Sequence, residues 1–126
     1  MDRRQITTNN APVATGPYSQ AVEINNCICT SGQLPVCPVT NTIVKGDIES
    51  QTIQVIKNTE AILLHAGYKL CDVVKANVFL KDLSLFIEFN KTYGQFFEFP
   101  YPARSCVEVS RLPKDVLIEM DVIAVK

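Results

Sequence analysis

Apolar residues recur along this chain at two spacings, which predict helices and strands respectively. Residues 47–67 carry apolar side chains at helical spacing, with Asp47 suited to cap the first turn and Gly67 suited to end the helix. A second helix is predicted from about Ser84 to Phe97, where aromatic residues form a stripe before Pro100. The pattern thus gives two amphipathic helices, of which the second is rich in aromatic residues.

Alternation of apolar and polar residues predicts the strands. The clearest case is residues 74–81, and the side chains expected together on one face there are Val74, Ala76, Val78 and Leu80. Further strands are expected at residues 5–8, 21–24, 27–31, 104–109 and 116–125. Residues 35–42 contain two prolines and predict a loop or a second hairpin. The order β-β-β-α-β-α-β-β indicates an α+β sandwich with two helices packed on one face of a mixed β-sheet.

Length and composition fit one globular domain that spans residues 1–126. The chain has 126 residues, of which 47% are hydrophobic and 20% charged, so it can form one core and is not disordered. Two helices cover only one face of the predicted sheet. The other face carries apolar side chains that would stay uncovered in a monomer, and this indicates an oligomer.

The charged and metal-binding residue types exclude several classes of function. The single histidine, His65, excludes a multi-histidine metal site and argues against a histidine-based triad. A net charge of -1 argues against nucleic acid as a partner. No apolar run approaches the ~20 residues of a membrane span, and no secretory leader is evident, so we expect a cytoplasmic protein.

Five cysteines have no spacing that favours a metal site. They are Cys27, Cys29, Cys37, Cys71 and Cys106, and neither a Cys-x-x-Cys motif nor a histidine cluster accompanies them. In the reducing cytoplasm we expect free thiols. We interpret them as small, buried apolar residues and expect no metal.

Arg104 and Glu119 are the residues most suited to chemistry. Arg104 begins an apolar strand, where its guanidinium needs a partner, either the carboxylate of a ligand or a structural carboxylate of the sheet. Glu119 lies in the middle of an apolar strand, so its pKa should be raised and suit general acid/base catalysis. The alternatives for Glu119 are a solvated edge residue or the structural partner of Arg104.

Two glycine-containing loops and one cysteine are weaker candidates. Residues 16–20 and 30–33 place glycine beside hydroxyl and amide side chains, which can bind an anion or a carbonyl oxygen but also occur in ordinary turns. The serines in these loops have no evident base, which argues against a serine hydrolase. Cys106 follows Arg104 closely and is either an activated thiolate or an inert core residue.

The order of several short motifs resembles that of a known family. Residues 102–120, with PARSCVEVSRLPK at their start, are similar to the signature of the Rid family, the reactive intermediate (enamine/imine) deaminases. The segments GPYSQA, TSGQ, GDI, VFLKD and the pair Asn90 and Tyr93 fit the same pattern in the same order. The resemblance extends from about Ile6 to Val125, which is nearly the whole chain.

The resemblance implies a fold, an assembly and an activity. Rid proteins have a chorismate-mutase-like fold and form homotrimers with ligand clefts between subunits. They hydrolyse 2-enamine and 2-imino acids, of the 2-aminoacrylate and 2-aminocrotonate type, to 2-keto acids and ammonia without a cofactor or metal. Some members are described as translation-inhibitor-type RNA endonucleases. A non-catalytic metabolite-sensing or chaperone-like role is a further alternative.

The resemblance also implies roles for individual residues. Arg104 matches the arginine that binds the substrate carboxylate, and Glu119 matches the glutamate that orients water and transfers protons. The other positions that match the substrate-binding cleft are Tyr18, Ser31, Gly32, Asn90 and Cys106, with Gly32 and Cys106 contributing backbone groups.

Overall fold

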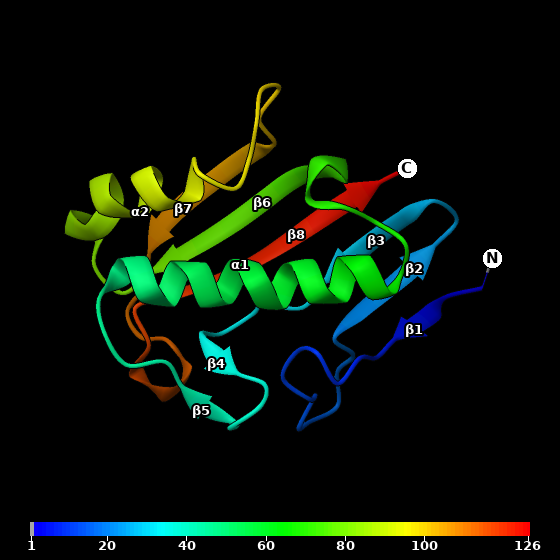
Figure 1. Ribbon diagram of the computed structural model, residues 1–126, viewed down its shortest axis with the longest axis horizontal. Helices are drawn as coiled ribbons and strands as arrows, with labels where there is room; N and C mark the ends of the chain where they lie inside the picture. The colour runs from blue at the N-terminus through cyan, green and yellow to red at the C-terminus, as the bar shows by residue number, and fades with distance from the viewer. Residues whose placement is uncertain (1) are drawn as a thin grey trace.

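One mixed sheet of six strands underlies the molecule, and both helices pack across the same face of it (Figure 1). The computed structural model describes residues 2–126. In sheet order the strands are β1 (Arg4–Ile6), β2 (Ala21–Ile24), β3 (Cys27–Thr30), β8 (Ile118–Val125), β6 (Val73–Leu80) and β7 (Ala103–Glu108). Only β6 and β7 pair in parallel, and the other neighbours are antiparallel. The predicted α+β fold with two helices on one face of a mixed sheet is confirmed.

Helix α1 (Ile48–His65) begins and ends where the sequence predicts. The Asp47 carboxylate accepts a hydrogen bond of 3.0 Å from the backbone N–H of Ser50, which satisfies a free donor of the first turn. After the helix, Gly67 has a φ of +88°, a conformation that costs glycine little. The buried side of α1 packs on the sheet through side chains such as Val55, Ile56 and Ile62.

Helix α2 (Phe86–Tyr93) is shorter than the predicted segment from Ser84 to Phe97. A 3-10 turn, Leu83–Leu85, precedes it, and the chain leaves the helix at Gly94. Phe97 nevertheless stacks on Tyr93 with the ring centroids 4.4 Å apart. The apolar spacing therefore continues past the helix because the aromatic packing continues, whereas the helical backbone does not.

Strand β6 contains a β-bulge that the alternation pattern did not predict. Val73 pairs with Ala124 and Lys75 pairs with Ile123, so Val74 has no partner of its own on β8. As a result Val73 is buried and Val74 is 48% exposed. The prediction that Val74 shares a face with Ala76, Val78 and Leu80 is therefore wrong, whereas those three residues do share the buried face.

Two smaller elements complete the chain. Strands β4 (Val36–Cys37) and β5 (Thr42–Ile43) form a separate hairpin. Of the loop and the second hairpin that were predicted as alternatives for residues 35–42, the hairpin is therefore the one that forms. A 3-10 turn, Pro113–Asp115, precedes β8, which therefore starts at Ile118 and not at Val116.

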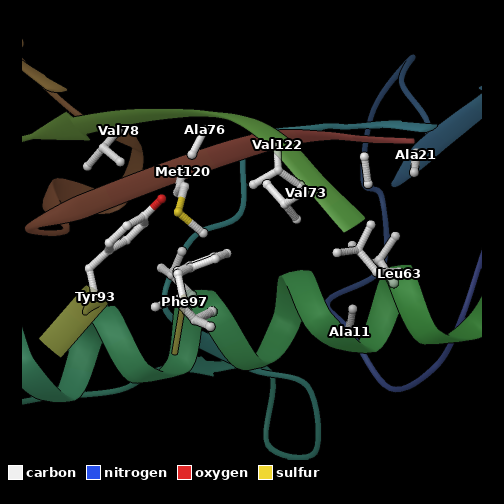
Figure 2. Close-up of a cluster of buried hydrophobic side chains, with 14 of the residues drawn as sticks. Ala11, Ala21, Leu63, Val73, Ala76, Val78, Tyr93, Phe97, Met120 and Val122 are labelled. Atoms are coloured by element: carbon white, nitrogen blue, oxygen red, sulfur yellow. The ribbon is translucent and has the colours of Figure 1, made fainter. Parts of the chain in front are cut away.

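The two faces of the sheet differ in what covers them. The face toward the helices is buried, and Figure 2 shows Ala76, Val78, Met120 and Val122 of the sheet facing Tyr93 and Phe97. We call the other side the open face. Along β8 it carries Glu119, Asp121 and Ile123, which are half-buried and alternate with buried core residues.

The expected burial of the cysteines is wrong for this chain. Cys29 and Cys71 are exposed, and Cys27, Cys37 and Cys106 are half-buried. In β3 the buried position belongs to Ile28, which places its two cysteine neighbours on the open face. All five cysteines are free thiols, as expected.

Candidate functional site

Arg104 lies on β7, on the face of the sheet that the helices cover. It pairs with buried Ala76 of β6, and paired residues point to the same side of a sheet. Its guanidinium lies over three aromatic rings of α2, with the carbon Cζ 5.6, 5.3 and 4.8 Å from the ring centroids of Phe86, Phe89 and Tyr93. The side chain is thus half-buried against α2.

No carboxylate neutralises Arg104 within the described chain. The ion pairs among residues 2–126 join Arg4 to Glu23 and Arg111 to Asp115, and Arg104 takes part in neither. The structural salt bridge that the sequence left open as an alternative is therefore absent from residues 2–126. A half-buried guanidinium with free N–H donors is suited to bind an anion.

A hollow of about 430 Å³ adjoins Arg104. Its lining residues are Asn90, Tyr93, Gly94, Tyr101, Pro102 and Arg104. Cys106 lies two residues further along β7, half-buried against the core. Burial raises the pKa of the Cys106 thiol in spite of the nearby positive charge of Arg104, so the interpretation of Cys106 as an activated thiolate loses support.

Glu119 lies on β8 and belongs to the open face. It pairs with Phe79 of β6. Phe79 lies three residues along β6 from Ala76, which pairs with Arg104. Burial, and then the negative charge of Asp121, raise the pKa of the Glu119 carboxyl, as the sequence predicted. Asp121 itself accepts a hydrogen bond of 2.9 Å from the Asn77 amide.

Gly32 lies directly against the Glu119 carboxylate. A Cβ atom at position 32 would overlap with Oε2 of Glu119 and lie 2.8 Å from its Cδ. The neighbouring Gln33 exchanges backbone hydrogen bonds with Met120, which holds the 30–33 loop beside β8. Only a residue without a side chain allows the carboxylate this close to the loop.

Ser31 and Tyr18 lie near Gly32. The Ser31 hydroxyl donates to the carbonyl oxygen of Ser19, which ties the 30–33 loop to the 16–20 loop. Tyr18 is 51% exposed, and its hydroxyl accepts a bond from the backbone N–H of Thr15. Tyr18 and Gly32 also line one small cavity of about 110 Å³.

The expected site residues therefore form two groups in a single chain. The arginine group consists of Arg104, Asn90 and Cys106, and the glutamate group consists of Glu119, Gly32, Ser31 and Tyr18. From strand geometry the Cα atoms of Arg104 and Glu119 are roughly 14 Å apart, and their side chains point to opposite faces. One small ligand cannot contact both groups within one chain.

Three aromatic residues beneath Arg104 were not predicted from the sequence to belong to the site. Phe86, Phe89 and Tyr93 were interpreted only as part of the apolar stripe of the second helix, and Phe89 and Tyr93 are indeed core residues. The signal that could have identified them is an arginine at the start of a strand that follows an aromatic-rich helix. Which strand packs next to the helix was not evident from the pattern.

Two further findings concern membranes and metals. Among residues 2–126, none of the helices is both long and apolar enough to cross a bilayer. The same residues contain no cluster of three or more His, Cys, Asp or Glu side chains that could hold a metal ion.

Comparison with known proteins gives matches over nearly the whole chain. The family model described as endoribonuclease L-PSP matches residues 8–126. A RutC family protein from Pyrococcus abyssi is 54% identical over 126 residues, which cover 100% of this chain and 99% of the relative. A 2-iminobutanoate/2-iminopropanoate deaminase from Escherichia coli is 51% identical over 126 residues, with 98% of both chains covered.

A solved structure gives the same result at the level of the fold. YyfA from Yersinia pestis, a protein of the conserved Rid family, superposes with a TM-score of 0.96 and is 44% identical. The match covers 99% of this chain and 100% of that chain.

Proposed function

The chain belongs to the Rid family, and from this premise we propose that it hydrolyses 2-enamine and 2-imino acids to 2-oxo acids and ammonia. The substrates would be of the 2-aminoacrylate and 2-aminocrotonate type, reacting through their imine tautomers. The observation that carries the proposal is the guanidinium of Arg104, which is half-buried and has no carboxylate partner among the described residues. A deaminase name borne by a relative 51% identical supports the choice of reaction.

Arg104 would bind the carboxylate of the substrate. Every 2-imino acid carries a carboxylate next to the C=N carbon, and the guanidinium fork can donate two parallel hydrogen bonds to it. The hollow beside Arg104 would receive the rest of the molecule, with Asn90 at its wall. This contact fixes the position of the C=N carbon relative to the protein.

Glu119 would activate water and transfer the proton. Its carboxylate takes a proton from water as the oxygen adds to the C=N carbon, and it returns this proton to the substrate nitrogen, which gives a tetrahedral amino alcohol. The Glu119 carboxylate then takes the hydroxyl proton as the C=O bond forms and gives it to the nitrogen as the C–N bond breaks. Ammonia leaves and the carboxylate is regenerated. The raised pKa of Glu119 suits both steps, because the group must accept and return a proton near neutral pH.

We propose that the complete site lies between subunits of a homotrimer. The arginine group and the glutamate group lie on opposite faces of the sheet, so a ligand between them needs the arginine group of one subunit and the glutamate group of another. The backbone of Gly32 and Cys106 and the side chains of Tyr18, Ser31 and Asn90 would complete the cleft. The proposed steps require no cofactor.

A coupled assay tests the proposal. A pyridoxal-phosphate-dependent dehydratase generates 2-aminoacrylate from serine, and ammonia release is followed with and without this protein. We expect the protein to accelerate release and Arg104→Ala to lower kcat/KM by about 100-fold or more, the order expected for loss of a charged hydrogen-bonded contact.

Arg111→Ala is the matched control. Arg111 is a surface arginine whose side chain is 80% exposed and pairs with Asp115, so its removal should leave turnover unchanged. If Arg104→Ala released ammonia as fast as the wild type, the assigned role of Arg104 would be wrong.

A further inference from the structure

We infer that Phe86, Phe89 and Tyr93 form an aromatic cage that holds the guanidinium of Arg104 in position for a carboxylate ligand. The inference rests on the proposed function, in which Arg104 binds the substrate carboxylate. The observation behind it is the convergence of three ring faces on one cation, with centroid distances of 4.8 to 5.6 Å. Each distance lies within the ≈ 6 Å over which a ring face attracts a cation.

Ring faces stabilise this cation without occupying its donors. A carboxylate next to Arg104 would accept its N–H groups and compete with a ligand, whereas a ring face attracts the positive charge through its quadrupole. The carboxylates of the neighbouring strands have other partners or positions. Glu108 of β7 accepts a hydrogen bond from the Leu83 backbone, and Glu119 lies on the open face.

The cage is built from well-packed residues. Phe89 is fully buried and Tyr93 is 5% exposed, and their ring centroids lie 5.4 Å apart. Figure 2 shows the Tyr93 ring extending from α2 toward Val78 and Met120 of the sheet, next to Phe97. Because the Phe89 and Tyr93 rings are fixed in the core, Arg104 is held before the ligand arrives, and less side-chain freedom is lost on binding.

The ring of Tyr93, and not its hydroxyl, makes this contact. The buried Tyr93 hydroxyl has no hydrogen-bond partner among the described residues, so it does not bond to Arg104. Phenylalanine would keep the ring face and remove only the hydroxyl. Tyr93→Phe is therefore a matched control for Tyr93→Leu.

The test measures affinity for 2-oxobutanoate, a carboxylate ligand that is not turned over. We expect the dissociation constant to rise about fivefold in Phe86→Leu, Phe89→Leu and Tyr93→Leu, and to stay within about twofold in Tyr93→Phe. Because Phe89 and Tyr93 are core residues, thermal unfolding is recorded for each variant. Phe86 is only half-buried, so Phe86→Leu is the variant in which a folding defect is least expected.

A second readout follows Arg104 directly. In the wild type, the NMR signal of the Arg104 Nε–Hε group should be shifted by the ring currents of the cage, and the leucine variants should move it toward the usual value. A role in folding alone would leave this signal unchanged in a variant that is still folded. We also expect KM to rise more than kcat falls, because the cage acts on binding.

The outcomes separate the cage from the proposed function. Unchanged affinity in folded Phe86→Leu, together with an unshifted Arg104 signal, would overturn the cage. A wild type that binds 2-oxobutanoate but does not accelerate imine hydrolysis would refute the deaminase proposal, while the affinity ratios would still decide the role of the cage. A wild type with no affinity for 2-oxobutanoate would refute both.

Discussion

Glu119 illustrates how a proposed catalytic role can oppose stability at a single residue. Its raised pKa shows that the folded state disfavours the ionised carboxylate, because the group is half-buried and lies near Asp121. A carboxyl whose pKa is higher in the folded than in the unfolded state lowers the stability of the fold as pH rises past its unfolded pKa. Glu119 therefore weakens the fold at neutral pH, and this cost is consistent with a functional role.

The first prediction concerns Glu119→Gln. We expect kcat to fall by about 100-fold or more, since the amide cannot accept a proton from water, while the melting temperature at pH 7 stays equal to or above that of the wild type. Ammonia release and thermal unfolding measure the two effects. Unchanged turnover, or a large loss of stability at pH 7, would argue against a proton-transfer role.

The same residue gives a prediction about pH. If ionised Glu119 activates water, kcat/KM should fall at acidic pH, with a midpoint above the ordinary glutamate pKa because the pKa of Glu119 is raised. Asp121→Asn should move the midpoint to lower pH, because it removes the neighbouring negative charge while the side-chain oxygen can still accept from Asn77. An acidic limb that does not move in Asp121→Asn would show that another group controls it.

Gly32 gives the third prediction at the scale of the residue. In Gly32→Ala the new Cβ would overlap with the Glu119 carboxylate, which must then swing away from the loop. We expect kcat to fall at least about tenfold with little loss of stability, because the displaced group is the end of a flexible side chain. Gly16→Ala is the control, since its Cβ would have no atom closer than 3.6 Å and turnover should be unaffected.

At the scale of the element, local patterns predicted much of this fold. Helix α1 was predictable because Asp47 and Gly67 mark its ends and its apolar spacing is regular. The bulge in β6 was not, because Val73 and Val74 are equally apolar and only the pairing with β8 decides which of them is buried. The register between strands, and not the pattern within one strand, contains that information.

The end of α2 shows a second limit of prediction from local pattern. Gly94 interrupts the aromatic stripe and was available as a signal for the end of the helix, but Phe96 and Phe97 keep the apolar spacing beyond it. Apolar spacing reports which side chains reach the core, and a turn can satisfy that requirement as well as a helix. The 45° angle between the Phe89 and Tyr93 rings and the stacking of Tyr93 on Phe97 belong to one continuous aromatic cluster.

The candidate site shows the same limit. The residue types alone identified Arg104 and Glu119 as candidates, because each is a charged residue in an apolar strand. Their placement on opposite faces depends on β6, which lies between β7 and β8 and pairs with the first in parallel and with the second antiparallel. No alternation within either strand reveals this relation, and the structure was needed to divide the site residues into two groups.

At the scale of the whole molecule, the open face links the fold to the proposed assembly. It displays half-buried Phe79, which pairs with Glu119, and half-buried Ile123 further along β8. It therefore offers both apolar area for association and one of the two proposed catalytic side chains. Association through this face would cover the apolar residues and bring Glu119 toward a neighbouring chain. The proposed oligomer is thus supported both by the burial of apolar side chains and by the proposed chemistry.

Subunit mixing tests whether the site is shared. Arg104→Ala and Glu119→Ala proteins, each expected to be inactive alone, are denatured together in equal amounts and refolded. If each site takes Arg104 from one subunit and Glu119 from the next, random trimers should regain about a quarter of the wild-type activity, because that fraction of the sites contains both intact residues. Refolding Arg104→Ala with the Arg104→Ala/Glu119→Ala double variant is the control and should restore none. Confirmed mixed trimers without activity would place both residues in the site of one chain, which the opposite orientation of their side chains argues against.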